Sequence, residues 1–153
     1  MAWLEKRLPP PLLAIVAVVL LVAAAKLWPA LRVSSSFQNV AGGLLIVIGV
    51  AIDLASILAF RRAQTTVNPL RPEATTQLVT VGPFHRSRNP MYVGLVLIVT
   101  GCAVVIGTIV GPFVVAAIIA YLTRFQIQPE ERAMRELFSE SFEHYCRTVP
   151  RWL

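Results

Sequence analysis

The chain has 153 residues, of which 56% are hydrophobic and only 14% are charged. Soluble domains carry about 25% charged residues, so this composition argues against a soluble enzyme and indicates a polytopic membrane protein with a single domain, residues 1–153. The net charge is +6, but no basic stripe interleaved with aromatic residues accompanies it. The excess therefore indicates the positive-inside bias of a membrane protein, with no nucleic-acid partner.

Four apolar segments are long enough to cross a bilayer as helices, which takes about 20 residues each. No small-residue cleavage site follows the first of them, so we interpret it as a retained span. Gly42, Gly43 and Gly49 in the second segment predict close approach to a neighbouring helix. Gly111-Pro112 predicts a tight reversal, which makes a helical hairpin of spans three and four. The expected spans are about 12–31, 40–60, 90–108 and 112–128.

Four spans would place both termini and the polar segments 61–89 and 129–153 on one side of the membrane. Twelve of the 14 Lys and Arg residues fall on that side, and only Lys26 and Arg32 fall on the other. The positive-inside rule then predicts that the termini and both polar segments are cytoplasmic. In the last segment, apolar residues at spacings of three to four predict an amphipathic helix against the membrane face or capping the spans: Met134, Leu137, Phe138, Phe142 and Tyr145.

The start of the third span carries an ordered polar motif. Asn is a favoured residue before the first turn of a helix and Pro is favoured at the first helical position, so Asn89-Pro90 predicts a helix start. The backbone N–H groups of such a start attract anions, and Arg86 and Arg88 add positive charge. The two cysteines, Cys102 and Cys146, lie in unlike surroundings and predict neither a disulfide nor a metal site.

The hairpin brings a second charged group to this place. About twenty residues lead from Pro90 to the reversal, and about nineteen lead from the reversal to Glu130 and Glu131. At 1.5 Å of rise per residue both arms end at the same depth, so the glutamates should stand beside Arg88 and Asn89. Such a site suits a ligand of mixed charge; charge alone leaves nucleotides, amino acids and S-adenosylmethionine open.

Two stretches together resemble the isoprenylcysteine carboxyl methyltransferase and phospholipid methyltransferase superfamily. They are TVGPFHRSRNPMYVG and, some 35 residues later, PEERAMRELFSESFEHYCRTVPRW; TTVNP at 65–69 resembles the bacterial branch. The resemblance implies an integral membrane methyltransferase that uses S-adenosylmethionine, forms S-adenosylhomocysteine, and has no Rossmann fold. It implies three catalytic candidates, Arg88, Tyr92 and Glu131, within a cofactor site of eight residues: His85, Arg88, Asn89, Pro90, Tyr92, Gly94, Glu130 and Glu131.

Asn89 departs from the His of the eukaryotic prenylcysteine enzymes, so the resemblance favours the bacterial or phospholipid-type branch and an inner-membrane location. Phe138 also lacks the Gly that often follows it in the family. The implied methyl acceptor is lipophilic and reaches the site from the bilayer. An isoprenylcysteine carboxylate, a lipid amine and a small thiol all remain open, and with them the question of which residue, if any, acts as base.

Structural roles compete with these functional ones. Arg88 with a glutamate also fits a salt bridge that fixes the hairpin, and Tyr92 also fits an interfacial anchor. Asp53 in the second span is either a contact for a ligand cation or a partner of Ser56. Arg61 fits a topology signal or a substrate gate. At the level of function, a membrane reductase with a nicotinamide cofactor and a non-catalytic scaffold stay open, and nothing in the sequence fixes an oligomeric state.

Overall fold

The computed structural model describes residues 8–63 and 78–153, and these are helical with no strand. The TTVNP stretch and Lys6, Arg7 and Arg71 lie outside the described residues. The elements follow the four expected apolar segments closely. In chain order they are α1 (Pro10–Leu27), the 3-10 turn η2 (Pro29–Leu31), α2 (Gln38–Arg62), the 3-10 turn η4 (Gly82–His85), α3 (Pro90–Ile106), α4 (Gly111–Leu122), the π-helix η5 (Thr123–Ile127) and α5 (Gln128–Thr148).

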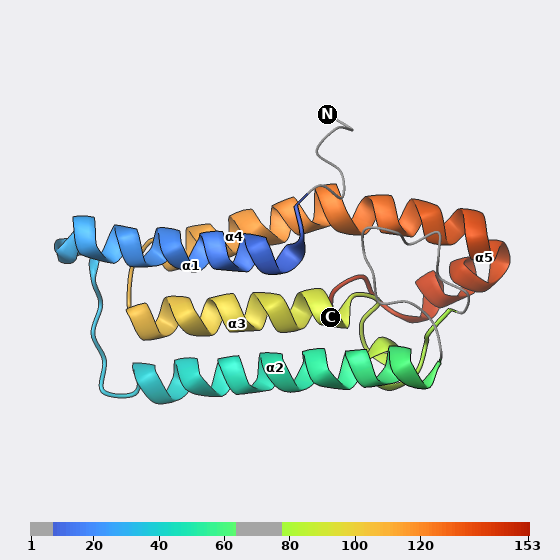
Figure 1. Ribbon diagram of the computed structural model, residues 1–153, viewed down its shortest axis with the longest axis horizontal. Helices are drawn as coiled ribbons and strands as arrows, with labels where there is room; N and C mark the ends of the chain where they lie inside the picture. Colours follow the sequence, from blue (N-terminus) through green and yellow to red (C-terminus); the bar gives the residue numbers. More distant parts are fainter. Residues whose placement is uncertain (1–7, 64–77) are drawn as a thin grey trace.

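The helix α3 lies in the middle of the bundle, with α2 along one side and α1 and α4 along the other (Figure 1). The core forms between α3 and the α1–α4 pair. Its fully buried members come from three helices and the π-helix: Leu21, Val99, Leu122 and Ile127. Because α2 packs mainly on α3, the rest of its surface stays open.

Glycines hold α2 and α3 together. Gly42 faces Gly101 and Gly49 faces Gly94, so close that a Cβ on Gly49 would lie 2.6 Å from the carbonyl oxygen of Gly94. Glycines seven residues apart recur on one face of each helix, and their lack of a side chain lets the two backbones touch. This confirms the close approach expected for Gly42 and Gly49. The expectation for Gly43 was wrong, because a Cβ there would meet nothing within 4 Å.

The hairpin of α3 and α4 turns earlier than the sequence suggested. Gly107 ends α3 in the left-handed conformation, with φ of 65°, and Gly111 and Pro112 already belong to the first turn of α4. The turn is tied to the α1–α2 connection, since the Val33 N–H donates to the Gly107 carbonyl at 2.7 Å. Gly107 is the residue that can take this backbone conformation at little cost.

The expected fourth span is α4 together with the π-helix, and the chain then runs on into α5 in nearly the same line (Figure 1). π-helical turns are rare and often occur at functional sites. The helix α5 is bent at Ser139, whose φ is 42°, and beyond the bend the chain doubles back. Phe142 and Tyr145 are then buried against Leu78, which precedes α3.

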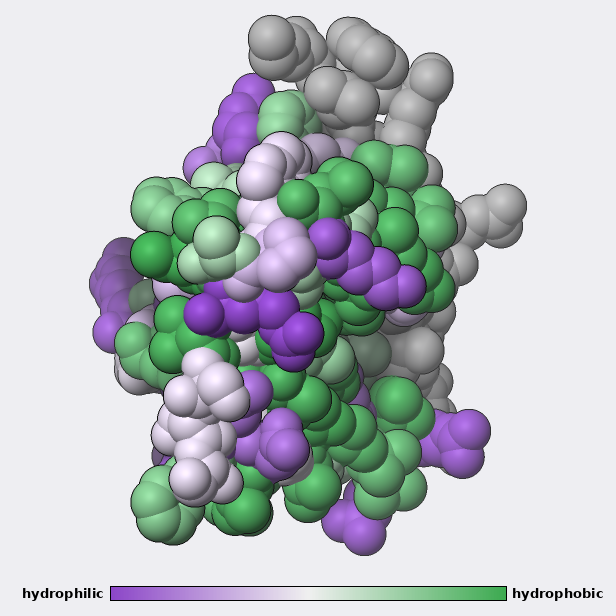
Figure 2. Space-filling view, turned by 90° about the vertical axis from the view of Figure 1, so that its left-hand side faces the viewer, coloured by the Kyte–Doolittle hydropathy of each residue, from purple (hydrophilic) through white to green (hydrophobic). Residues whose placement is uncertain are grey.

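Two of the described helices, α1 and α2, are long and apolar enough to cross a membrane. A core helix of a soluble protein passes the same test, but it would be mostly buried. Only 22% of the apolar window of α1 and 17% of that of α2 are buried. Figure 2, which faces the end with the α3–α4 turn, shows apolar residues over much of the surface. The chain thus fits a membrane protein, while four spans and a cytoplasmic tail remain predictions.

Candidate functional site

The site begins at the three residues before α3. The Arg88 N–H donates to the carbonyl of Pro150 at 2.9 Å, and the Asn89 N–H donates to Ser87 Oγ at 3.1 Å. Asn89 and Pro90 start α3 as expected, but the Asn89 side chain does not cap the helix. Its amide donates instead to the carbonyl of Arg151 at 2.9 Å. The helix start is therefore fixed by a segment some sixty residues away.

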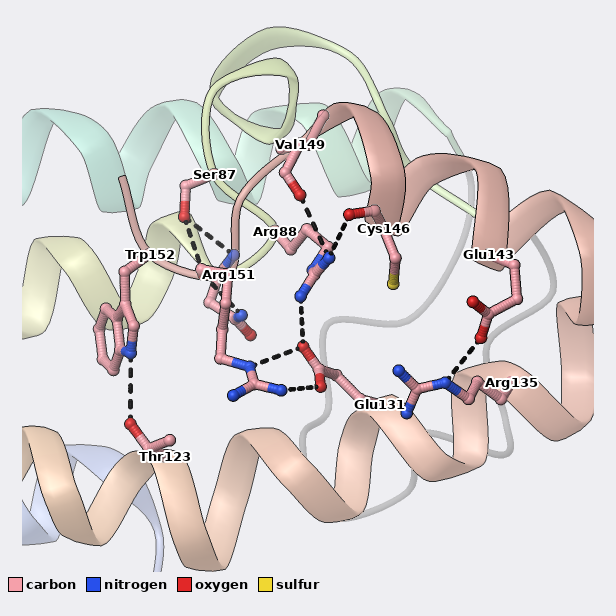
Figure 3. A network of polar contacts seen from close by, with 11 residues as sticks. Ser87, Arg88, Thr123, Glu131, Arg135, Glu143, Cys146, Val149, Arg151 and Trp152 are labelled. Atoms are coloured by element: carbon pink, nitrogen blue, oxygen red, sulfur yellow. Dashed lines mark hydrogen bonds and ion pairs between the residues drawn. The ribbon is translucent and has the colours of Figure 1, made fainter.

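One carboxylate joins two arginines beside this helix start (Figure 3). Glu131 Oε1 accepts from Arg88 Nη2 at 2.9 Å and from Arg151 Nε at 3.0 Å, and its Oε2 accepts from Arg151 Nη2 at 2.6 Å. The side chains of Glu131 and Arg88 are 6% and 11% exposed. A buried carboxylate of this kind needs such partners, because desolvation alone would make its charge costly. The juxtaposition expected from the hairpin is present.

The electrostatics of this cluster keep Glu131 ionised. Burial raises the pKa of its carboxyl group, but the hydrogen bond from Arg151 and the positive charges of Arg151 and Arg88 outweigh burial, so the pKa lies below its ordinary value. Within the described residues no group of three or more His, Cys, Asp or Glu side chains is arranged to hold a metal ion. The Arg88–Glu131–Arg151 cluster is held together by ion pairs and hydrogen bonds.

A second contact joins α3 to α5 one turn along. The hydroxyl group of Tyr92 donates to Glu130 Oε1 at 2.6 Å, and the tyrosine ring is buried in the core. Both glutamates of the Glu-Glu pair thus contact the start of α3, Glu131 through Arg88 just before the helix and Glu130 through Tyr92 in its first turn. Of the eight residues expected in the site, six come together here: Arg88, Asn89, Pro90, Tyr92, Glu130 and Glu131.

The segment 149–152 completes the cluster, although the sequence analysis assigned its residues no part in the site. Arg88 Nη1 donates to the carbonyls of Cys146 and Val149 at 2.9 and 3.2 Å, and the Trp152 indole donates to Thr123 Oγ1 at 3.2 Å. Arg151 is the most important omission, because it makes the two-point contact with Glu131. The only local signal was the Val-Pro-Arg-Trp end of the resembling stretch, which is too short to reveal its partners.

His85 and Arg86 take no part in the hydrogen bonds described for the cluster. His85 lines an open cavity of about 750 Å³ between the segment before α3 and the second half of α5, together with Glu140 and His144. Beside this cavity the Tyr145 hydroxyl donates to the Phe84 carbonyl at 2.6 Å, and burial raises the pKa of Tyr145. Arg86 is exposed. Val149, whose carbonyl accepts a hydrogen bond from Arg88, also lines this cavity, so His85 lies at the edge of the cluster.

Gly94 and Asp53 meet on the α2 side of α3. Gly94 follows Tyr92 by two residues, about 200° around the helix, so it faces α2 and not Glu130. A Cβ on Gly94 would collide with the carboxylate of Asp53. Asp53 does not bond Ser56, whose hydroxyl donates to the Ile52 carbonyl at 2.7 Å. Arg61 is exposed in the last turn of α2.

Apolar helices with open flanks and a buried, charged cluster at one end of the bundle fit a membrane protein with a polar site at that end. The model of the phospholipid methyltransferase family matches residues 37–141, more than half of the chain. The chain belongs to the phospholipid methyltransferase family, which points to a membrane methyltransferase. No curated protein and no solved structure matches it.

Proposed function

We propose that the protein transfers a methyl group from S-adenosylmethionine to a lipophilic acceptor that reaches the site from the bilayer. The observation that carries this proposal is the convergence of Arg88 and the two glutamates on the start of α3. The family supports methyl transfer, and the separation of charge within the cluster suits a ligand with both an anionic and a cationic group. S-adenosylmethionine is such a ligand.

One atom of the cluster bears on whether S-adenosylmethionine could bind there. Arg88 Nε is buried and has no hydrogen-bond acceptor among residues 8–63 and 78–153. A buried guanidinium N–H without an acceptor costs on the order of 1–3 kcal/mol, and a ligand carboxylate would supply the acceptor. The donor set therefore fits the amino-acid end of S-adenosylmethionine, with Arg88 on its carboxylate and Glu130 on its ammonium group or ribose diol.

The described contacts give each residue of this proposal a distinct task. S-adenosylmethionine supplies an electrophilic methyl group on sulfur when it is bound. Glu131 and two backbone carbonyls hold the Arg88 guanidinium in one orientation, and Tyr92 holds the Glu130 carboxylate. Such fixed positions favour a displacement reaction, which depends mainly on the alignment of the reacting groups. His85 and its cavity would lie at the edge of the cofactor site.

The proposed setting is a four-span protein with its site on the cytoplasmic side. The cofactor would enter from the cytoplasm at the start of α3. The acceptor would arrive from the bilayer along the open flanks of α1 and α2, which keep most of their apolar side chains exposed. A water-insoluble acceptor would explain why the reaction takes place in a membrane protein.

Calorimetric titration of the protein in lipid nanodiscs with S-adenosylhomocysteine measures its binding and tests the proposal. Saturable binding is expected in the unaltered protein, and about fivefold weaker binding in Tyr92→Phe, because the Glu130 carboxylate loses a hydrogen bond worth about 1 kcal/mol. Arg135→Ala is a matched control, since its ion pair with Glu143 is exposed. A folded protein that ignores S-adenosylhomocysteine and binds NADPH would instead be a nicotinamide-dependent reductase, and one that binds neither would be a scaffold.

A further inference from the structure

Residues 149–152, which we call the strap, lie between the two walls of the proposed site. The backbone of the strap contacts the start of α3. The carbonyls of its first three residues accept hydrogen bonds from Arg88 Nη1, the Arg88 N–H and the Asn89 side-chain amide, at 3.2, 2.9 and 2.9 Å. The start of α3 is therefore held by an extended segment that follows the end of α5.

The side chains of the last two strap residues contact the opposite wall (Figure 3). Arg151 forms the two-point ion pair with Glu131, and the Trp152 indole donates to Thr123 Oγ1 at 3.2 Å. Thr123 belongs to the π-helix and Glu131 to the first turn of α5. The strap thus joins the start of α3 to the π-helix and α5 through polar contacts.

The strap is anchored most firmly at its beginning. Val149 is 5% exposed and packs in the apolar cluster formed with the second half of α5. Beyond it, Pro150 is exposed, the Arg151 side chain is 36% exposed, and Trp152 lies half-buried against the core. Polar contacts exchange with water at a smaller net cost than buried apolar ones, and local openings occur where apolar contacts are few. The strap can therefore swing about Val149 while α5 stays in place.

The closed position of the strap has a cost at Arg88. The strap contributes to the burial of this side chain, which is 11% exposed, and Arg88 Nε is left without an acceptor in the described parts of the chain. Opening the strap would give this N–H to water, which favours the open position. A ligand carboxylate that accepted from Nε would favour the closed position instead, because only a ligand with unequal affinity for two states shifts their populations.

We propose that the strap is a gate over the Arg88 end of the site, hinged at Val149 and held shut by the contacts of Arg151 with Glu131 and of Trp152 with Thr123. It opens to admit a ligand with a free carboxylate and closes when Arg88 donates to that carboxylate. The identity of the ligand as S-adenosylmethionine rests on the proposed function, whereas the opening of the strap does not.

Amide hydrogen exchange measures the opening without any ligand. The Arg88 N–H donates to the Pro150 carbonyl, so it exchanges with solvent when the strap leaves. Thr123→Val removes the acceptor of the Trp152 indole and should raise the exchange rate of this N–H about fivefold over the unaltered protein. The same exchange rate in Thr123→Val as in the unaltered protein would overturn the gate.

Thr100→Val is the matched control for this comparison. Thr100 and Thr123 each donate to the carbonyl four residues earlier in their own helix, both at 2.7 Å, but of the two only Thr123 accepts from the Trp152 indole. Thr100→Val should therefore leave the exchange of the Arg88 N–H unchanged. An equal rise in both variants would trace the effect to the loss of the helical hydroxyl and would also overturn the gate.

Binding kinetics test what the gate admits. Replacing Trp3 and Trp28 by Phe leaves Trp152 as the only tryptophan, and its fluorescence can follow stopped-flow mixing with S-adenosylhomocysteine. Because entry and exit both wait for the strap, Thr123→Val should raise the association and dissociation rate constants alike, about fivefold, and leave the affinity nearly unchanged. An unchanged association rate constant would overturn the gating role. If the unaltered protein binds no S-adenosylhomocysteine, the proposed methyl transfer fails, while the exchange comparison still decides whether the strap opens.

Discussion

Arg88 and Glu131 form a buried ion pair whose removal should be costly. Arg88→Ala would leave the Glu131 carboxylate, 6% exposed, with one guanidinium in place of two and would strip two backbone carbonyls of their donor. Breaking a buried pair from one side typically costs about 3–5 kcal/mol. We expect a loss of this order in the free energy of unfolding, measured by denaturant titration in detergent.

The exposed pair of Arg135 and Glu143 provides the control for this prediction. Its nitrogen and oxygen lie 2.8 Å apart, a distance like that in the buried pair, but the two side chains are 45% and 47% exposed. Exposed pairs contribute about 0–1 kcal/mol. Equal losses for Arg88→Ala and Arg135→Ala would contradict the view that burial makes the cluster important for stability.

The pH dependence of stability should show the charge of Glu131. The two arginines hold the pKa of its carboxyl group below the ordinary value of 4.5, against the opposing effect of burial. A group whose pKa is depressed on folding stabilises the protein above its unfolded pKa, and this contribution is lost as the pH falls through the folded value. The melting temperature in detergent should therefore fall below about pH 4.5, and the Glu131→Gln protein should show a smaller fall over the same range.

At the level of single residues, the sequence predicted the contacts that follow from helix geometry. The equal lengths of the hairpin arms placed Glu130 and Glu131 beside Arg88, because a helix advances by a fixed rise. Arg151 could not be placed in this way. Its position depends on the bend at Ser139 and on hydrogen bonds to residues some sixty positions away, and no local pattern records either.

At the scale of the helices, the close packing of α2 on α3 predicts that Gly49 and Gly43 respond differently to substitution by alanine. A Cβ on Gly49 would lie 2.6 Å from the Gly94 carbonyl and 2.8 Å from a side-chain carbon of Ile98, so Gly49→Ala must push the helices apart. Overpacking of this kind costs about 1–3 kcal/mol. Gly43→Ala meets no atom within 4 Å and should be neutral or slightly stabilising, because alanine favours a helix over glycine. Thermal unfolding of both variants in one detergent checks the difference, and equal melting temperatures would contradict the glycine contact.

The helix boundaries were harder to predict from the sequence than the helices themselves. Apolar runs predicted the existence of four helical segments, since a bilayer-length helix has a strong composition signal. The reversal was placed at Gly111-Pro112, because Gly-Pro is a common turn signal, but Gly107 takes the left-handed conformation and Pro112 fits the first turn of α4. The π-helix at Thr123–Ile127 leaves the apolar pattern intact, so composition could not reveal it.

On the scale of the whole molecule, the basic residues are distributed unevenly between the two ends of the helical bundle. Lys26 and Arg32 lie where α1 ends and the α1–α2 connection begins, and the cluster around Arg88 lies at the opposite end of α3. The bundle therefore has one end with few basic residues and one end with a basic, salt-bridged site. Such polarity supports the proposed orientation, with the site toward the cytoplasm.

Labelling of single cysteines tests that orientation directly. In a Cys102→Ser, Cys146→Ser background, Arg62→Cys would mark the end of α2 beside the site, and Ser35→Cys would mark the exposed α1–α2 connection at the other end. In a bacterial host, a membrane-impermeant maleimide should react with the first variant only in inverted membrane vesicles and with the second only in intact spheroplasts. The reverse pattern would place the polar cluster outside the cytoplasm, away from the S-adenosylmethionine that the proposed reaction requires. Reaction of both variants from one side would show that α2 does not cross the bilayer.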